Sequence, residues 1–334
     1  MKKATIKDVA KATGLSLGTI SKYINGGTVK EANKQIIDRV IKDLGYEVDT
    51  YARGMVTKKT KTIGLVIPEF NNLFYASFSQ EFEKALDKYG YALVVRESFY
   101  DYEREKQSIE WLNSRRTDAI VVAPVGTNSL QYEFLKQYSV PIIFIDRYIP
   151  NLNFEFAIVN NKDATKESIK FLLDNGHKNI LMIAAKEGLY TADERVKGYK
   201  EAYKEKNIDV NNNLILRLSE EVDDIYHVVR KILKHKTLDF TALFTANYPS
   251  TIGSMFAINE LKLSIPNDYS MIGFDDVIFT KIFRPKLTIV RQPIEEMAST
   301  LTKRIITLIN EEDYQYQVNE FNCSFEINNS TTSI

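Results

Sequence analysis

Residues 5–27 have the sequence TIKDVAKATGLSLGTISKYINGG, and this stretch decides how the N-terminal part of the chain folds. Ile6, Val9 and Ala10 recur at positions i, i+3 and i+4, which places them on one face of an α-helix. Gly14 follows as a residue that tolerates the left-handed backbone at a helix C-terminus. The pattern therefore predicts a short amphipathic helix that ends at a turn.

Residues with N-cap chemistry precede the first two predicted helices. Thr5 is followed three residues later by Asp8, as in a capping box, and Ser16 stands at the start of the second helical stretch. A third helix is predicted for residues 31–44, with Gly45 at its end. Two helices joined by a short glycine-containing turn and backed by a third are typical of a helix-turn-helix domain.

From Thr62 onward, short apolar runs are separated by longer amphipathic stretches. The apolar runs, which predict β-strands, are residues 63–67, 91–95, 119–122, 141–145, 180–184, 241–245 and 270–274, with a further strand-like stretch at 321–327. The amphipathic stretches, which predict helices, include residues 77–88, 104–114, 162–175 and 195–207. Strands that alternate with helices form a parallel sheet covered on both faces, and this part of the chain is long enough for two such sheets. We therefore expect two α/β lobes, with ligands bound between them at the carboxyl ends of the strands.

Composition excludes several classes of protein. Of the 334 residues, 44% are hydrophobic and 26% are charged, as in an ordinary globular chain. No apolar run approaches the ~20 residues of a membrane-spanning helix, and no apolar stretch follows the basic N-terminus, so we expect a cytoplasmic protein without a membrane partner. One cysteine and three histidines argue against a disulfide framework and a metal centre, and we expect no cofactor.

The overall net charge of zero conceals two oppositely charged parts. Residues 1–61 contain thirteen Lys and Arg against six Asp and Glu, a net charge of +7. The remaining residues contain 31 Lys and Arg against 38 Asp and Glu, a net charge of −7. A basic helical segment attached to an acidic body favours a polyanionic partner for the basic segment alone.

Short motifs follow one another in a fixed order along the chain. The N-terminal motifs are Thr5–Ala10, Gly14–Ser16, Thr19–Lys22, Asn25–Gly26, Leu44–Tyr46 and Ala52–Met55. The later motifs are Lys61–Pro68, Asn72–Phe74, Glu194–Tyr199, Ile272–Asp276 and Leu287–Ile289. In order and spacing they resemble the LacI/GalR family of transcription regulators. The resemblance implies an all-α helix-turn-helix domain (residues 1–47), a hinge helix and linker (48–61), and a periplasmic-binding-protein-like domain for effector binding and dimerisation, with two α/β lobes and parallel sheets (62–334).

The resemblance also implies which residues contact DNA. Leu17 and Gly18 stand where the family varies its base-reading side chains, but neither offers a hydrogen bond, so phosphate contacts and DNA shape should carry more weight. Lys22 replaces the usual arginine, keeping the charge and losing the planar fork. The remaining expected contacts are Thr5, Ser16, Thr19, Ser21, Asn25 and Tyr46. Thr5 and Asn25 are equally well explained as a helix cap and a turn residue.

Residues 49–56 resemble the hinge helix that this family folds on operator DNA. Ala52 and Met55 are the expected DNA contacts, with Met55 as an apolar wedge in the minor groove. Gly54 weakens this helix by about 1 kcal/mol relative to alanine, which favours folding only on DNA. A plain linker is the alternative.

Six residues are candidates for effector binding by the same resemblance. The guanidinium of Arg195 and the carboxylate of Asp275 can each engage two adjacent hydroxyls, which suits a sugar. The alternative is that they form a buried ion pair with each other or with neighbouring residues. Asp146 and Gln292 are further candidates that could instead anchor the segments crossing between the lobes. The remaining two candidates are Phe74 and Asn247.

These features predict a ligand-responsive repressor, most simply of carbohydrate-utilisation genes. It would bind a pseudo-palindromic operator in double-stranded DNA as a homodimer, with a sugar or sugar derivative in the cleft. One alternative is control by a phosphorylated carrier protein as corepressor. Another is a sugar-binding protein without DNA function, which the missing export signal and the basic segment oppose. An enzyme is not expected, because the chain shows no catalytic-triad order, phosphate-binding loop or metal-ligand cluster.

Overall fold

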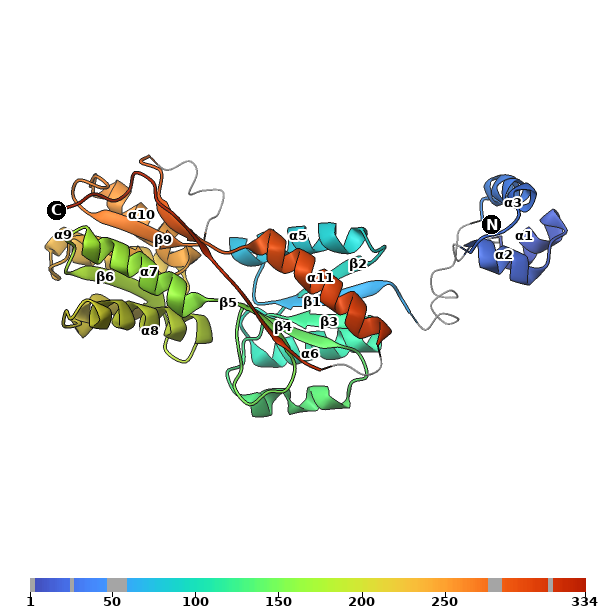
Figure 1. Cartoon of the computed structure of the whole chain (residues 1–334), viewed down its shortest axis with the longest axis horizontal. Coiled ribbons are helices and arrows are strands. Elements are labelled where there is room, and N and C mark those ends of the chain that lie inside the picture. The colour runs from blue at the N-terminus through green and yellow to red at the C-terminus, as the bar shows by residue number, and fades with distance from the viewer. Residues whose placement is uncertain (1–3, 25–26, 47–58, 276–283, 312–314) are drawn as a thin grey trace. The chain divides into compact units, whose positions relative to one another are not determined.

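The computed structural model describes residues 4–24, 27–46, 59–275, 284–311 and 315–334. The chain forms two compact units, Met1–Thr60 and Lys61–Ile334. The N-terminal unit contains the helices α1 (Ile6–Thr13), α2 (Leu17–Ile24) and α3 (Glu31–Leu44) (Figure 1).

Each of these three helices places one fully buried residue in a shared core: Val9, Ile20 and Ile37. The Thr5 hydroxyl accepts from the amide of Asp8 while the Asp8 carboxylate accepts from the amide of Thr5, so the predicted capping box is present. The three-helix arrangement confirms the helix-turn-helix prediction.

The second unit consists of two lobes, each built on a six-stranded sheet. Lobe 1 has the strands β1 (Thr62–Ile67), β2 (Ala92–Glu97), β3 (Ala119–Val122), β4 (Ile142–Ile145), β5 (Glu155–Val159) and β11 (Val318–Phe321). Its helices are α5 (Leu73–Asp87), α6 (Tyr102–Ser114), α11 (Ile294–Asn310) and a 3-10 helix at Ser129–Gln137. The strand order is β11-β5-β4-β3-β1-β2, and all neighbours run parallel.

Lobe 2 repeats this plan. Its strands are β6 (Ile180–Ala185), β7 (Ile215–Leu218), β8 (Ala242–Thr245), β9 (Ser270–Phe274), β10 (Thr288–Arg291) and β12 (Ser324–Glu326). Its helices are α7 (Asn161–Asp174), α8 (Tyr190–Glu205), α9 (Val222–His235), α10 (Tyr248–Glu260) and a 3-10 turn at Asn212–Leu214. The strand order is β12-β10-β9-β8-β6-β7, with β12 antiparallel to β10 and the other pairs parallel.

Successive side chains of each strand point to opposite faces of the sheet. In β6, Ile180 and Met182 pack under α7 and α8, whereas Leu181 and Ile183 pack under α9 and α10. In lobe 1, α5 and α11 cover one face of the sheet and α6 covers the other. Strands buried on both faces explain the continuous apolar runs in the sequence, and the predicted pair of parallel α/β lobes is confirmed.

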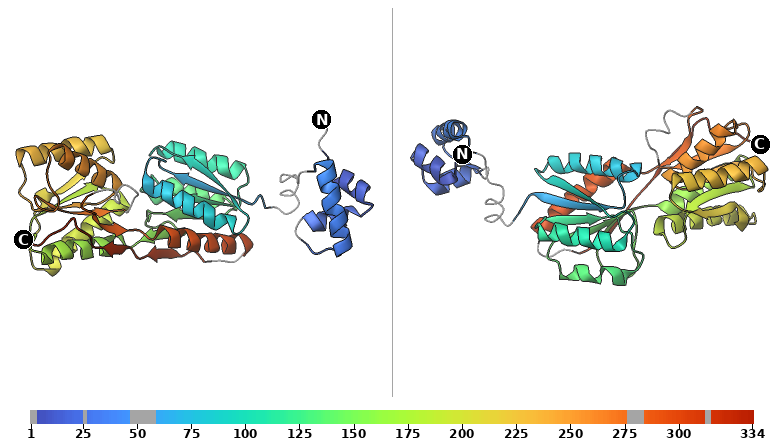
Figure 2. Two further views of the ribbon diagram at one scale, coloured as in Figure 1. Left: turned by 90° about the horizontal axis from the view of Figure 1, so that it is seen from above. Right: turned by 180° about the vertical axis from the view of Figure 1, so that it is seen from behind.

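The chain passes between the lobes three times, after β5, after β10 and between β11 and β12 (Figures 1 and 2). The prediction of one strand-like stretch at residues 321–327 is wrong, because the crossing divides it between two sheets. At the crossing, the amide of Cys323 donates to Asn160 Oδ1 (2.8 Å), and the Cys323 side chain packs against the cores of both lobes. Among the described residues, no helix is long and apolar enough to span a lipid bilayer.

Candidate effector cleft and DNA-binding face

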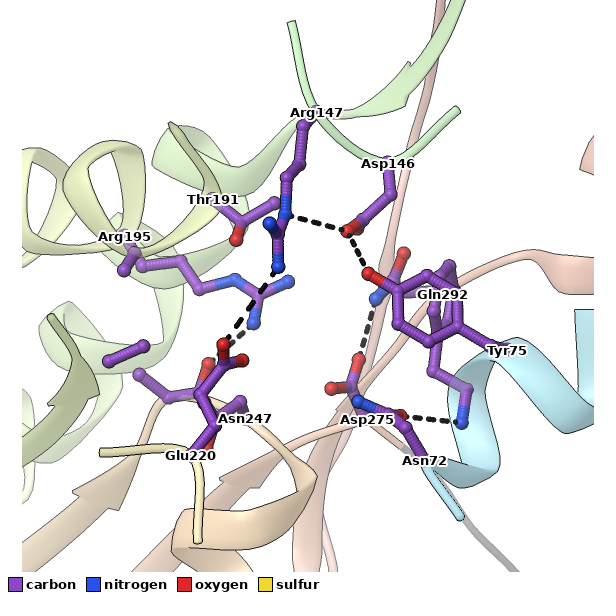
Figure 3. Close-up of a pocket in the computed structure, with 14 residues that line it drawn as sticks. Asn72, Tyr75, Asp146, Arg147, Thr191, Arg195, Glu220, Asn247, Asp275 and Gln292 are labelled. Carbon is purple, nitrogen blue, oxygen red and sulfur yellow. Dashed lines mark hydrogen bonds and ion pairs between the residues drawn. The ribbon is translucent and has the colours of Figure 1, made fainter. Parts of the chain in front are cut away.

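A pocket lies between the two lobes at the carboxyl ends of strands from both sheets (Figure 3). Asp146 directly follows β4, Asp275 follows β9 and Gln292 follows β10, so parallel strand direction brings these side chains to facing edges. The free volume is about 30 Å³, room for only about two or three water molecules, so protein side chains nearly fill the pocket.

All six sequence-predicted effector residues line this pocket: Phe74, Asp146, Arg195, Asn247, Asp275 and Gln292. Phe74 is buried in the first turn of α5 with its ring edge-on to Tyr75. Asn247 is the N-cap of α10, and its side-chain oxygen accepts from the amide of Ser250 (2.9 Å). Asn247 therefore has a structural role as well as a position in the pocket.

The two aspartates share an uncommon backbone conformation, with φ of 69° at Asp146 and 76° at Asp275. Asp is among the few non-glycine residues that adopt this left-handed region, and such residues gather at binding sites. Tyr75 donates its hydroxyl to Asp146 Oδ2 (3.0 Å), and Gln292 Nε2 donates to Asp275 Oδ1 (2.6 Å). Burial raises the pKa of Asp146, while nearby Arg147 and Arg195 oppose that rise.

Arg195 is held by protein groups rather than left open to a ligand. Its Nε donates to Asn161 Oδ1 (2.8 Å), its Nη1 donates to the carbonyl of Ala246 (2.5 Å), and its guanidinium lies 3.6 Å from the ring centre of Phe274. Two of its three nitrogen atoms thus already have acceptors, unlike the open fork expected from the sequence. These three partners are uncharged, so the contacts of Arg195 are not the alternative of a buried ion pair with Asp275 or with a neighbour.

Arg147, which the sequence analysis did not select, lies across the pocket (Figure 3). Its Nη1 donates to the carbonyl of Pro124 (3.1 Å), its Nε lies 3.6 Å from Asp146 Oδ2, and its Nη2 lies 3.9 Å from Glu220 Oε2. Its Nε is buried without a hydrogen-bond partner among the described residues. Arg147 directly follows Asp146 at the end of an apolar run, so the rule that ligands bind at the carboxyl ends of parallel strands could have found it. Glu220 follows β7, whose sequence contains no continuous apolar run, so the same rule gave no indication of it.

The proposed DNA-contacting residues of α2 lie on its outer face. Ser16, Leu17, Gly18 and Lys22 are exposed, and Leu17 has 44% of its surface accessible. The Ser16 hydroxyl accepts from the amide of Thr19 (3.1 Å), as expected of an N-cap.

The remaining DNA candidates are less exposed or lie outside the described residues. Thr19, Ser21 and Tyr46 are partly buried, and Tyr46 packs against the helical core. Thr5 is exposed, but its hydroxyl belongs to the capping box. Asn25, Ala52 and Met55 lie outside the described residues.

Comparison with known proteins gives matches over both units. Residues 5–49 match the family model of bacterial regulatory proteins of the lacI family. Residues 60–328 match the model of periplasmic binding proteins and the sugar-binding domain of the LacI family. Neither description is of an enzyme, in agreement with the expectation from the sequence.

Individual proteins match over most of the chain. The ribose operon repressor of Halalkalibacterium halodurans is 28% identical over 94% of this chain and 94% of its own length. The lac repressor dimer bound to operator and an anti-inducer superposes with a TM-score of 0.86 at 20% identity, covering 99% of this chain and 100% of that one. A LacI family regulator from Enterococcus faecium with bound ribose has a TM-score of 0.73 at 22% identity, covering 82% of this chain and 99% of that one.

Proposed function

The chain belongs to the LacI family of bacterial regulatory proteins, and from that premise we propose that it is a homodimeric repressor whose affinity for operator DNA is set by a sugar in the cleft between its lobes. One observation carries this proposal. Hydrogen-bonding side chains from both lobes converge on a single pocket in a chain that begins with a helix-turn-helix unit.

The chemistry of the cleft supports a sugar as effector. Its side chains offer carboxylate, amide and guanidinium groups beside the ring of Phe74, a combination that suits hydroxyls on an otherwise apolar ring. The name of the similar ribose operon repressor and the ribose bound to the Enterococcus faecium protein point the same way. Because the pocket holds only about 30 Å³, admitting a sugar requires side chains or lobes to move. Effector binding is thereby linked to the arrangement of the lobes.

We further propose that three segments of the chain have separate functions. Residues 1–47 bind DNA, residues 48–61 form the hinge, and residues 62–334 bind the effector and dimerise. The exposed face of α2 supports this assignment, because Leu17, Gly18 and Lys22 are available to enter a major groove. A regulator that reads operator DNA acts in the cytoplasm.

Selection from random double-stranded DNA with the full-length protein tests the DNA half of the proposal. The enriched sequences should contain two half-sites related by two-fold symmetry, because each protomer presents one recognition helix. Replacing Lys22 with alanine should weaken binding to the enriched site by roughly tenfold. Lys42→Ala, an exposed lysine on α3, is the matched control and should change binding little. Enriched sequences without symmetry would contradict the dimeric mode of binding.

Titration of neutral sugars into the protein–operator complex tests the effector half. A sugar that changes operator affinity when no other protein is present favours a small-molecule effector over a phosphorylated carrier protein. An operator affinity that responds only when the carrier protein is added would favour the alternative.

A further inference from the structure

The cleft contains more negative than positive charge. Asp146, Glu220 and Asp275 contribute carboxylates, and Arg147 and Arg195 contribute guanidinium groups. Among the described residues that line the pocket, none is lysine or histidine. A ligand that carries further negative charge would therefore depend on these two arginines.

Neither arginine presents an open fork. Arg195 uses Nε and Nη1 on Asn161 and on the carbonyl of Ala246, and it stacks on Phe274. Arg147 donates to the carbonyl of Pro124 and lies between the carboxylates of Asp146 and Glu220. Recognition of a phosphate normally uses parallel, charge-assisted donors from such a fork, and here part of each fork is already used on a protein acceptor.

Among the described residues, the unsatisfied groups of the cleft are the buried donor Arg147 Nε and two acceptors, on Gln292 and Glu220. Gln292 is 5% exposed, and its Oε1 is buried without a hydrogen-bond partner among the described residues. Glu220, whose side chain is 22% exposed, has its nearest cation, Arg147 Nη2, at 3.9 Å, which is beyond hydrogen-bond distance. Within the described part of the chain no hydrogen bond reaches the Glu220 carboxylate, which points toward the middle of the cleft (Figure 3). A ligand hydroxyl can donate to these acceptors and can also accept from Arg147 Nε.

Hydroxyl groups supply such donors, whereas a phosphate dianion supplies only acceptors and adds negative charge beside three carboxylates. We propose that the cleft is selective for an uncharged polyhydroxylated ligand and rejects its phosphorylated form, with Glu220 as the residue that sets this specificity. The inference rests on the proposed function, since it names the ligand class of the same cleft. Glu220 accepts from a ligand hydroxyl and repels an anionic substituent placed near the guanidinium of Arg147.

Calorimetric titration of the full-length protein with matched pairs of ligands tests this inference. The probes are ribose and ribose 5-phosphate, glucose and glucose 6-phosphate, and fructose and fructose 6-phosphate. For the pair that binds, the neutral sugar should bind on the order of 100-fold tighter than its phosphate, because juxtaposed like charges are strongly unfavourable. Glu220→Gln should reduce this ratio by roughly tenfold, chiefly by improving the affinity for the phosphate.

Glu221→Gln provides the matched control, because Glu221 is the exposed neighbour of Glu220 and does not line the pocket. The ratio within each variant is insensitive to a modest loss of folded protein, and the melting temperature of each variant checks the fold. A phosphate that binds the unaltered protein as tightly as its neutral sugar overturns the inference but leaves the proposed sugar effector standing. A ratio that changes equally in Glu220→Gln and Glu221→Gln overturns the role of Glu220. If none of the six probes binds, the proposed sugar effector fails and the inference fails with it.

Discussion

Lobe 1 and lobe 2 use the same strand order to place one aspartate each at the cleft. The order β11-β5-β4-β3-β1-β2 corresponds strand by strand to β12-β10-β9-β8-β6-β7. Asp146 follows β4 and donates its amide to the carbonyl of Ala157 on β5 (3.0 Å), while Asp275 follows β9 and donates its amide to the carbonyl of Val290 on β10 (2.9 Å). Both aspartates have left-handed backbones. The topology of the sheet therefore positions the carboxylate, whichever lobe provides it.

The surroundings of these equivalent positions differ. Asp146 accepts from the hydroxyl of Tyr75 and lies 3.6 Å from the guanidinium of Arg147, whereas Asp275 accepts from the neutral amide of Gln292. The last strand of each sheet differs as well, since β11 runs parallel to β5 and β12 runs antiparallel to β10. The shared topology thus fixes where the two aspartates lie, while the neighbouring side chains decide the electrostatic environment and the stability of each lobe. Each difference between the lobes can be tested by a pair of matching substitutions.

The largest difference is expected between two ion pairs, Glu155 with Arg304 in lobe 1 and Arg291 with Glu326 in lobe 2. In lobe 1, Glu155 is fully buried and receives two hydrogen bonds from Arg304 (2.9 and 3.0 Å), so Glu155→Ala should cost about 3–5 kcal/mol by leaving a guanidinium without its carboxylate. In lobe 2, Arg291 and Glu326 pair with 37% of each side chain exposed, so Glu326→Ala should cost at most about 1 kcal/mol. Urea unfolding monitored by circular dichroism and by Trp111 fluorescence measures both losses. Equal losses would mean that burial of the pair does not control its contribution.

The next difference is a pH response of opposite sign. Burial raises the pKa of Glu105 in lobe 1 from 4.5 to about 7, against hydrogen bonds from Tyr132 and the amide of Val125. A raised folded-state pKa gives a contribution to stability that is fully present below the unfolded-state pKa and is lost as the pH rises through 7. Burial lowers the pKa of His177 in lobe 2, so its contribution is present above about pH 6.5 and is lost as the pH falls through the lowered value.

Free energies of unfolding measured from pH 4.5 to pH 8 reveal these two responses. Glu105→Gln should remove a loss on the alkaline side on the order of 3 kcal/mol, and His177→Gln should remove a loss on the acidic side. His227→Gln, an exposed histidine on α9, is the control and should leave the acidic side unchanged. If the Glu105→Gln variant still lost stability as the pH rises through 7, the loss would come from another titratable group.

The smallest difference concerns the cleft itself. Asp146→Asn and Asp275→Asn should each weaken binding of the best neutral sugar by about 10- to 150-fold, the loss of a hydrogen bond to a charged group worth about 1.5–3 kcal/mol. Asparagine tolerates the left-handed backbone, so these variants test the charge alone. Asp146→Asn should also lower the melting temperature, because it removes a carboxylate beside the buried guanidinium of Arg147. An equal drop in melting temperature for Asp275→Asn would show that Gln292 makes the second aspartate just as important for stability.

The sequence by itself determined the helical unit, the two α/β lobes and six residues that the structure brings to one pocket. Periodicity and capping depend on neighbouring residues, so the pattern around Thr5, Ser16 and Gly45 predicted three helices whose ends the structure confirms. Continuous apolar runs predicted seven strands, and six of them are buried on both faces of a sheet, whereas β2 is partly exposed. The position of Asp146 and Asp275 followed from the rule for parallel strands together with the family resemblance.

Only the tertiary structure decided which other residues complete the cleft and which protein groups hold the arginines. β7 is only half buried, so its sequence lacks a continuous apolar run and gave no reason to select Glu220 beyond its end. The acceptors of Arg195 come from Asn161 and Ala246, which lie 34 and 51 residues away along the chain. The stretch at residues 321–327 is divided between two sheets because the chain crosses the lobes there. These features depend on which distant segments come into contact after the chain has passed three times between the lobes. A local pattern of residues carries no information about such long-range contacts.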